Sequence, residues 1–311
     1  MKVGIWDVDS TIPNLAIMRL SAWHKAQGHD VRWYSPLFAD DYDIAYASKV
    51  FATSSRDGLD PEKIQIGGTG WDMRVSLPDE VEAMTPDYSI YGYPHNIGFT
   101  MRGCRLRCSF CVVPEKEGRP VSASTIDEIW SQRDSDFVML LDNDFFGNPE
   151  WPDRIAEIRA HNLRVCFSQG LNIRNIKPDQ AGAVASVRFS NMNATKRQVH
   201  FAWDDPRHEK LIHKGIATCV ESGIRPSEMA FYVLIGYHST PEEDLHRVMT
   251  LRDYGCDPYV MPYDKSDRYQ RQFQRWVNHR AIFRTTSWTD YNGSIKGRAD
   301  RNTIPLFDVT A

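Results

Sequence analysis

Three of the six cysteines stand close together, in the segment Gly103-Cys104-Arg105-Leu106-Arg107-Cys108-Ser109-Phe110-Cys111. Three thiolates on one short loop can wrap a cubane [4Fe–4S] cluster, and they leave its fourth iron without a protein ligand, open to a substrate. A zinc site would need a fourth Cys or His at matching spacing, and none follows nearby. The C-x3-C-x2-C spacing therefore predicts an iron–sulfur cluster on Cys104, Cys108 and Cys111. A non-catalytic iron–sulfur or zinc-binding interaction protein is the alternative.

The other three cysteines, Cys166, Cys219 and Cys256, are spread along the chain. The first falls in a predicted strand, the second in a predicted helix, and the third directly after Gly255. Free cysteine is commonly a small buried apolar residue, so we interpret these three as structural. A second cluster on them is the less favoured interpretation.

Composition is that of an ordinary globular protein, with 41% hydrophobic and 25% charged residues and a net charge of −4. No stretch approaches the roughly 18 apolar residues of a membrane-spanning helix. Residues 1–9 carry acid within their apolar run and do not read as a secretory signal. We therefore expect a cytoplasmic protein without a membrane partner.

Strands and helices alternate along the chain, which predicts an α/β fold. In residues 1–75 the pattern indicates a small doubly wound, Rossmann-like domain with a parallel sheet, followed by a proline-marked linker at 76–96. In residues 97–263 six βα repeats favour a partial (β/α)6 barrel over an open sheet. The expected strands there are 97–101, 137–141, 164–168, 199–203, 229–235 and 258–261. In such a barrel the working residues lie just past the carboxyl ends of the strands.

The cysteine segment, with an aromatic residue before its last cysteine, resembles the signature of the radical S-adenosylmethionine enzymes. The resemblance covers residues 97–263, and that family's partial barrel agrees with the predicted repeats. It implies that the open iron binds the methionine moiety of S-adenosylmethionine. Reductive cleavage then gives methionine and a 5′-deoxyadenosyl radical. It also implies an electron donor such as flavodoxin or ferredoxin.

The resemblance also implies cofactor contacts at the ends of successive strands. Phe110 is expected near the adenine, and Asp142 or Asp144 is expected to accept from the methionine ammonium. The usual Gly-Gly-Glu is replaced here by Asp142-Asn143-Asp144-Phe145. Polar groups that would reach the ribose or the methionine carboxylate are Ser168, Gln169 and Asp204. The apolar run that ends in Ile235 and Gly236 is expected beside the adenine.

Different parts of this sequence resemble two branches of the family. Cys108-Ser109-Phe110-Cys111-Val112-Val113-Pro114 resembles the methylthiotransferases that modify tRNA bases, but residues 1–103 contain no cysteine for their second cluster. Residues 1–75, with the glycine turn Gly67-Gly68-Thr69-Gly70, look like a cobalamin-binding domain. The histidine motif of that domain is missing, because Asp7-Val8-Asp9-Ser10-Thr11 stands in its place. Cobalamin is possible but not favoured; a domain that only caps the barrel is preferred. We interpret the glycine turn as a tight connection, not a phosphate loop.

The C-terminal segment, 264–311, differs from the rest of the chain in its positive charge. Residues 265–301 hold nine Lys/Arg against three Asp, a net +6 in a chain that totals −4. A helix is expected at 267–283, with an aromatic stripe that includes Phe273 and Trp276 and a basic stripe of Arg268, Arg271, Arg275 and His279. The basic stripe suits the neutralisation of phosphates in RNA or DNA. The alternative interpretation is that the aromatic residues pack the helix onto the rest of the protein and the arginines form its solvent-exposed face.

The expected function is therefore radical chemistry on a bound organic substrate. Methyl or methylthio transfer to a nucleic-acid base or nucleotide is preferred, and tailoring of a small molecule is the second expectation.

Overall fold

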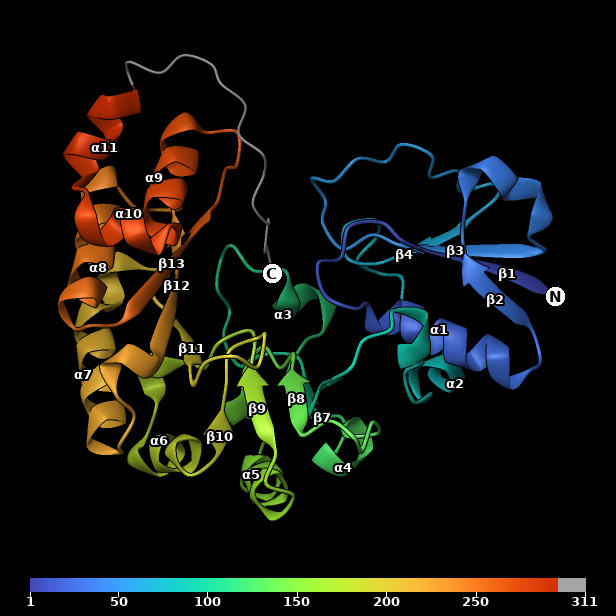
Figure 1. The fold of residues 1–311 in the computed structure, drawn as a ribbon, viewed down its shortest axis with the longest axis horizontal. Helices are drawn as coiled ribbons and strands as arrows, with labels where there is room; N and C mark the ends of the chain where they lie inside the picture. Colours follow the sequence, from blue (N-terminus) through green and yellow to red (C-terminus); the bar gives the residue numbers. More distant parts are fainter. Residues whose placement is uncertain (296–311) are drawn as a thin grey trace. The chain divides into compact units, whose positions relative to one another are not determined.

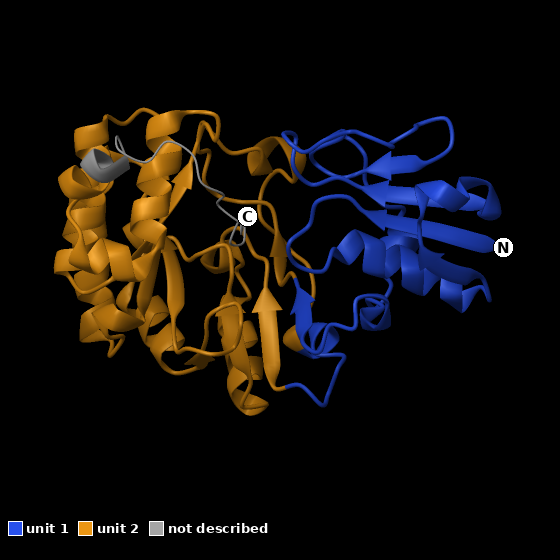
Figure 2. Cartoon of the chain, turned by 45° about the horizontal axis from the view of Figure 1, so that its top comes forward, with its two compact units in different colours: residues 1–98, 127–135 blue, residues 99–126, 136–311 orange. Residues whose placement is uncertain are grey.

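The computed structural model describes residues 1–295. Its chain forms two compact units, drawn in different colours in Figure 2. Unit 1 comprises residues 1–98 and 127–135, and unit 2 comprises residues 99–126 and the described chain from 136 onward. No helix in the described part is both long and apolar enough to cross a bilayer.

Unit 1 is built on a four-stranded parallel sheet of order β2-β1-β3-β4. Val3 and Ile5 of β1 are fully buried and pack with Ile17 of α1, which fixes the helix against the sheet. Asn14 caps α1 by accepting from the backbone N–H groups of Ala16 and Ile17. The elements are β1 (Lys2–Asp7), α1 (Leu15–Ala26), β2 (Asp30–Trp33), η1 (Pro36–Asp41), β3 (Ile44–Ser48), β4 (Gln65–Gly67), α2 (Asp79–Glu82), η2 (Tyr88–Ile90) and β5 (Asn96–Gly98).

Unit 2 begins with a hairpin and continues with parallel strands. The hairpin strands β6 and β7 are antiparallel, and β8, β9 and β10 lie side by side with all pairings parallel. Every residue of β8 is buried, as expected for a strand covered on both faces. The elements are β6 (Met101–Arg102), α3 (Val113–Lys116), β7 (Val121–Ser122), β8 (Phe137–Leu140), η3 (Phe145–Gly147), α5 (Trp151–Ala160), β9 (Arg164–Phe167), η4 (Ile173–Asn175), α6 (Pro178–Ala185) and β10 (Arg188–Phe189). The short helix α4 (Ile126–Ile129) lies between β7 and β8 in the chain, but its residues from 127 onward belong to unit 1.

A second parallel sheet of order β11-β12-β13 completes the β structure of unit 2. A bridge between Leu171 and Phe201 brings the chain after β9 beside β11. Helices α8 and α9 pack against β13 (Figure 1). The elements are β11 (Val199–Ala202), η5 (Pro206–His208), α7 (Glu209–Glu221), η6 (Pro226–Glu228), β12 (Met229–Ile235), α8 (Pro241–Asp253), β13 (Asp257–Pro262), α9 (Arg268–Asn278), α10 (Arg280–Thr285) and α11 (Trp288–Ile295).

These observations confirm a mixed α/β fold with parallel sheets, and no closed barrel is present in the described residues. The division of the chain at 75, 96 and 263 stays a prediction, and residues 296–311 of the expected C-terminal segment lie outside the described part.

Two expected elements differ from the structure. The strand expected at 97–101 is divided between β5 and β6, because Thr100 N and Met101 N donate to the Asp142 carboxylate at 2.7 and 3.0 Å. The helix expected at 267–283 breaks at His279, which has ψ 88°. Just before the break, the side chain of Asn278 bonds to both backbone polar groups of Val260, at 2.8 and 3.0 Å.

Candidate functional site

The three clustered cysteines lie on the loop between β6 and α3 of unit 2. Gly103 enters this loop at φ +78°, and a Cβ there would lie 2.3 Å from the carbonyl oxygen of Arg119, so the position requires glycine. The Glu117 carboxylate holds the base of the loop, accepting from Gly103 N at 2.8 Å and pairing with Arg102 at 2.7 Å. Cys104 N in turn donates to the carbonyl of Gly118 at 3.3 Å.

All three loop cysteines are free thiols of intermediate exposure. Burial, with a smaller contribution from negative charge on Asp144, Cys111 and Cys108, raises the pKa of Cys104 to about 11. Burial also raises the pKa of Cys108, and a charge on Cys111 acts in the same direction. Cys104 and Cys108 therefore both lie close enough to Cys111 for a charge on that residue to raise their pKa.

The donor set fits a cluster held by three thiolates, because three partly buried free sulfurs come from one braced loop. Within residues 1–295, no three Cys, His, Asp or Glu side chains are already arranged around a metal position.

Arg174 on η4 is a neighbour of the loop that sequence reasoning missed. Its guanidinium hydrogen-bonds to Cys108 and lowers the pKa of that thiol against the effect of burial. Its Nε donates to Asn172 Oδ1 at 3.1 Å, and its Nη1 lies 3.3 Å from His208 Nδ1. The sequence offered one indication of Arg174: it lies soon after the third expected strand, which is β9 in the structure, in the region where polar cofactor contacts were expected.

Asp142 and Asp144, one or the other of which was expected to accept from the methionine ammonium, are both buried and accept hydrogen bonds from protein donors. Asp142 accepts from the backbone of Thr100 and Met101 and from Thr100 Oγ1 at 2.6 Å. The Asp144 side chain is 1% exposed and accepts two hydrogen bonds from the Arg105 guanidinium, at 2.6 and 2.9 Å, and one from Arg105 N at 3.3 Å. Arg105 lies between the first two loop cysteines, so Asp144 ties the cysteine loop to the end of β8. The methionine contact stays a prediction for both residues.

The residues expected after β9 and β11 also lie at strand ends. Ser168 is buried, donates through Oγ to the carbonyl of Leu140 at 2.8 Å, and accepts at its own carbonyl from Tyr232 Oη at 2.8 Å. Gln169 is partly buried. Burial raises the pKa of Asp204 to about 6, although a hydrogen bond from Leu234 N and the charges of Arg247 and Arg174 oppose that rise. The charge of Arg174 thus lowers the pKa of both Asp204 and Cys108, which links Asp204 to the cysteine loop.

The aromatic residue of the cysteine loop meets the segment that follows β12. Phe110 and Tyr237 make an edge-to-face contact with ring centroids 5.5 Å apart, and Tyr237 lies 4.7 Å from the Tyr263 ring. Next to Tyr237, Gly236 has φ +73°, and a Cβ there would come within 2.2 Å of the Gln270 side chain. Ile235 is fully buried. Phe110 and the 235–237 segment, both expected beside the adenine, are therefore brought together, although Tyr237 was not singled out in advance.

The remaining cysteines are confirmed in the elements expected for them. Cys166 lies in β9, Cys219 in α7 and Cys256 just before β13, and all are buried. Burial raises the pKa of Cys219 and of Cys256 to about 12 and raises that of Cys166 further. Their environment is that of protonated, packed thiols.

In unit 1, the acidic segment that stands in place of a cobalamin histidine motif serves the local structure. Asp9 accepts from Val50 N and Phe51 N at 2.7 and 2.9 Å, and Asp7 accepts from Tyr91 Oη at 2.6 Å. Gly70 N donates to the carbonyl of Lys49 at 3.0 Å, so the glycine turn runs against the end of β3.

On α9 the expected aromatic stripe is buried and the expected basic stripe is exposed. Phe273, Trp276 and Val277 are at most 1% exposed. The basic stripe of Arg268, Arg271, Arg275 and His279 is exposed.

No protein-family model and no curated protein sequence matches this chain.

Proposed function

We propose that this protein is a radical S-adenosylmethionine enzyme whose unit 2 is a partial (β/α)6 barrel. The observation that carries the proposal is the braced loop of three free, partly buried cysteines, in contact through Phe110 with the segment after β12. Parallel β/α units keep their chemistry at the carboxyl ends of the strands, where β8, β9, β11 and β12 present the other expected cofactor residues.

In this proposal Cys104, Cys108 and Cys111 are the cluster ligands. The chemistry that a [4Fe–4S] cluster supplies there is one-electron reduction of bound S-adenosylmethionine, with flavodoxin or ferredoxin as donor. The Arg174 guanidinium offsets negative charge at Cys108, and the Arg105–Asp144 pair holds the loop against the end of β8.

The adenine is proposed to lie against Phe110, Tyr237 and the backbone of Ile235 and Gly236, because aromatic faces and exposed backbone groups suit a flat heterocycle. Ser168, Gln169 and Asp204 are proposed to face the ribose and the methionine carboxylate end.

Asp144 is proposed to bind the methionine ammonium, which would take the place of the Arg105 guanidinium at this carboxylate. Arg105 already presents a guanidinium to this carboxylate, so an ammonium in the same place would keep the buried charge balanced. Asp142, whose oxygens accept from Thr100 and Met101, is proposed to shape the site without direct contact.

The preferred reaction is methyl or methylthio transfer to a nucleic-acid base or nucleotide. The exposed arginine stripe of α9 supports a phosphate-bearing substrate. Unit 1 is proposed as a capping domain without cobalamin, because its Asp7 and Asp9 stand where a histidine ligand is sought. Tailoring of a small molecule is the second candidate.

Anaerobic reconstitution with iron and sulfide tests the metal centre. We expect about four irons per chain, a broad visible absorbance, and a change in the electron paramagnetic resonance spectrum of the reduced protein when S-adenosylmethionine is added. Zinc in place of iron, or a spectrum that S-adenosylmethionine leaves unchanged, would contradict the proposal.

A further inference from the structure

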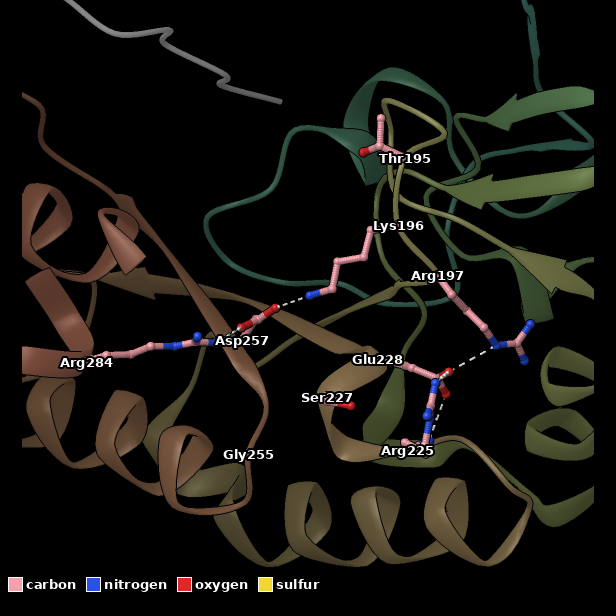
Figure 3. A pocket seen from close by; sticks show the side chains of 9 residues that line it. All are labelled: Thr195, Lys196, Arg197, Arg225, Ser227, Glu228, Gly255, Asp257 and Arg284. Carbon is pink, nitrogen blue, oxygen red and sulfur yellow. Dashed lines mark hydrogen bonds and ion pairs between the residues drawn. The ribbon is translucent and has the colours of Figure 1, made fainter. Parts of the chain in front are cut away.

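Unit 2 contains a pocket of about 470 Å³. Its lining includes four cationic side chains, Lys196, Arg197, Arg225 and Arg284, and two carboxylates, Glu228 and Asp257 (Figure 3).

These residues come from the amino ends of the second sheet. Lys196 and Arg197 precede β11, Arg225 and Glu228 precede β12, and Asp257 begins β13. The expected cofactor residues follow the carboxyl ends of these parallel strands. Because β12 spans seven residues, the two edges are about 20 Å apart. The pocket is therefore separate from the proposed reaction centre.

Both carboxylates are already satisfied. Asp257 accepts from Lys196 Nζ at 2.7 Å and Gln198 Nε2 at 2.9 Å, and pairs with Arg280 at 2.8 Å. Glu228 pairs with Arg225 at 2.7 Å and with Arg197 at 3.2 Å, and its side chain is 6% exposed. Figure 3 shows Lys196 and Arg284 approaching Asp257 from opposite sides, while Arg197 and Arg225 meet at Glu228.

Positive charge is left over after this pairing. Four lining cations against two carboxylates leave two positive charges, and Arg280, which shares Asp257, adds a third. The Arg225 and Arg284 side chains are 73% and 68% exposed, so their remaining N–H donors are open to a ligand. Simple ion pairing would need only one cation for each carboxylate.

The two surplus charges of the lining match the charge of one phosphate group. A phosphate monoester carries nearly two negative charges and several acceptor oxygens, and arginine binds such oxygens in a bidentate manner. Arg197 is already positioned, because its guanidinium lies 3.8 Å from the Phe189 ring centroid and donates to the carbonyl of Val187. The hydroxyl of Ser227 is a further possible donor in the lining.

We propose that this pocket binds a phosphate group, carried either by a free nucleotide or by a nucleic-acid strand. It is an anchoring site, distinct from the arginine stripe of α9, and it does not depend on the radical chemistry.

Binding by the full-length protein tests the pocket directly. The probes are inorganic phosphate, uridine monophosphate and a fluorescent single-stranded RNA of about ten nucleotides, titrated at low and moderate salt. The pocket variant is Arg225→Glu with Arg284→Glu. The matched control, which makes the same change in net charge, is Arg159→Glu with Lys210→Glu, at two exposed positions on α5 and α7. We expect the pocket variant to bind at least about tenfold more weakly and the control to bind as the wild type does.

The three probes distinguish the source of the phosphate. Similar affinity for the nucleotide and the RNA indicates a single phosphate group in the pocket. Much tighter RNA binding that weakens with salt, and that the pocket variant reduces, indicates a strand. Either result supports the pocket. No binding of any probe, or RNA binding that the pocket variant leaves intact, would overturn it. Should the charge-reversed protein fail to fold, Arg225→Gln with Arg284→Gln gives the same test with less repulsion.

Discussion

Asp142, which follows β8, has a structural role inside the candidate site, because it accepts hydrogen bonds from the backbone of Thr100 and Met101. Burial raises the pKa of Asp142 to about 6, although hydrogen bonds from Thr100 and Met101 oppose that rise. The value is above the roughly 3.9 of an exposed aspartate. Between about pH 4 and about pH 6, the folded protein therefore holds a proton on Asp142 that the unfolded chain has released.

This difference predicts a pH dependence of stability. Because the folded-state pKa is raised, folding binds a proton between about pH 4 and about pH 6, and the free energy of unfolding falls as the pH rises through that window. The loss amounts to about 3 kcal/mol and is complete above about pH 6. Asp142→Asn keeps one carbonyl oxygen, which can accept from both Thr100 N and Met101 N as Oδ1 of Asp142 does. Because the amide does not titrate, urea unfolding of the variant should lack this loss. Parallel pH profiles for the two proteins would contradict the assignment.

The Arg105–Asp144 pair gives a second prediction. Arg105→Met leaves a carboxylate that is 1% exposed without its cation, and we expect a loss of about 2 kcal/mol in the free energy of unfolding together with faster loss of iron in air. The double variant Arg105→Met with Asp144→Asn removes the unpaired charge and should recover most of the stability. Equal stability of the two variants would show that the pair does not brace the loop.

The sequence was sufficient to locate the thiol ligands but not their neighbours. Cysteine spacing is a local property, so Cys104, Cys108 and Cys111 could be predicted as one group. Arg174 and Tyr237 meet the loop only because η4 and the end of β12 are folded against it. Such long-range contacts leave no spacing signal in the chain.

At the scale of elements, strongly patterned segments were predictable. The strand expected at 229–235 is β12 residue for residue, because its run of apolar residues is buried throughout most of its length. The helix expected at 267–283 was not predicted correctly near its C-terminal end, since a tertiary contact between Asn278 and Val260 ends α9.

Helix α9 allows its two faces to be tested separately. Trp276 is fully buried, donates from Nε1 to the carbonyl of Thr286 at 3.0 Å, and contacts the Phe283 ring at 4.9 Å. We expect Trp276→Ala to lower the free energy of unfolding by about 3–5 kcal/mol in chemical denaturation. A loss below about 1 kcal/mol would mean that the aromatic stripe does not hold the helix.

The opposite face of α9 is expected to affect binding and not stability. Reversing Arg268, Arg271 and Arg275 to Glu should leave the melting temperature nearly unchanged, because all three are exposed. If the stripe faces phosphates, the slope of log affinity for RNA against log salt should fall by about two to three. An unchanged slope would favour the small-molecule substrate.

At the scale of the whole molecule, the proposal assigns the radical chemistry to unit 2 alone. Every residue proposed as a cluster ligand or cofactor contact belongs to that unit, while the acidic residues at the end of β1 serve the local structure of unit 1. The alternation of strands and helices predicted an α/β fold with parallel sheets, and the structure confirms it. Where the chain divides was less predictable, because residues 127–135 belong with unit 1 although they lie within the second βα series.

The most direct test of the central claim is cleavage of S-adenosylmethionine by the reconstituted protein with dithionite. We expect 5′-deoxyadenosine from the wild type and none from Cys108→Ser, while Cys256→Ser, which alters a buried thiol away from the loop, should remain active. Loss of product only in the loop variant is the result that the account predicts. Absence of 5′-deoxyadenosine from wild-type protein that holds about four irons, or full activity in Cys108→Ser, would contradict it.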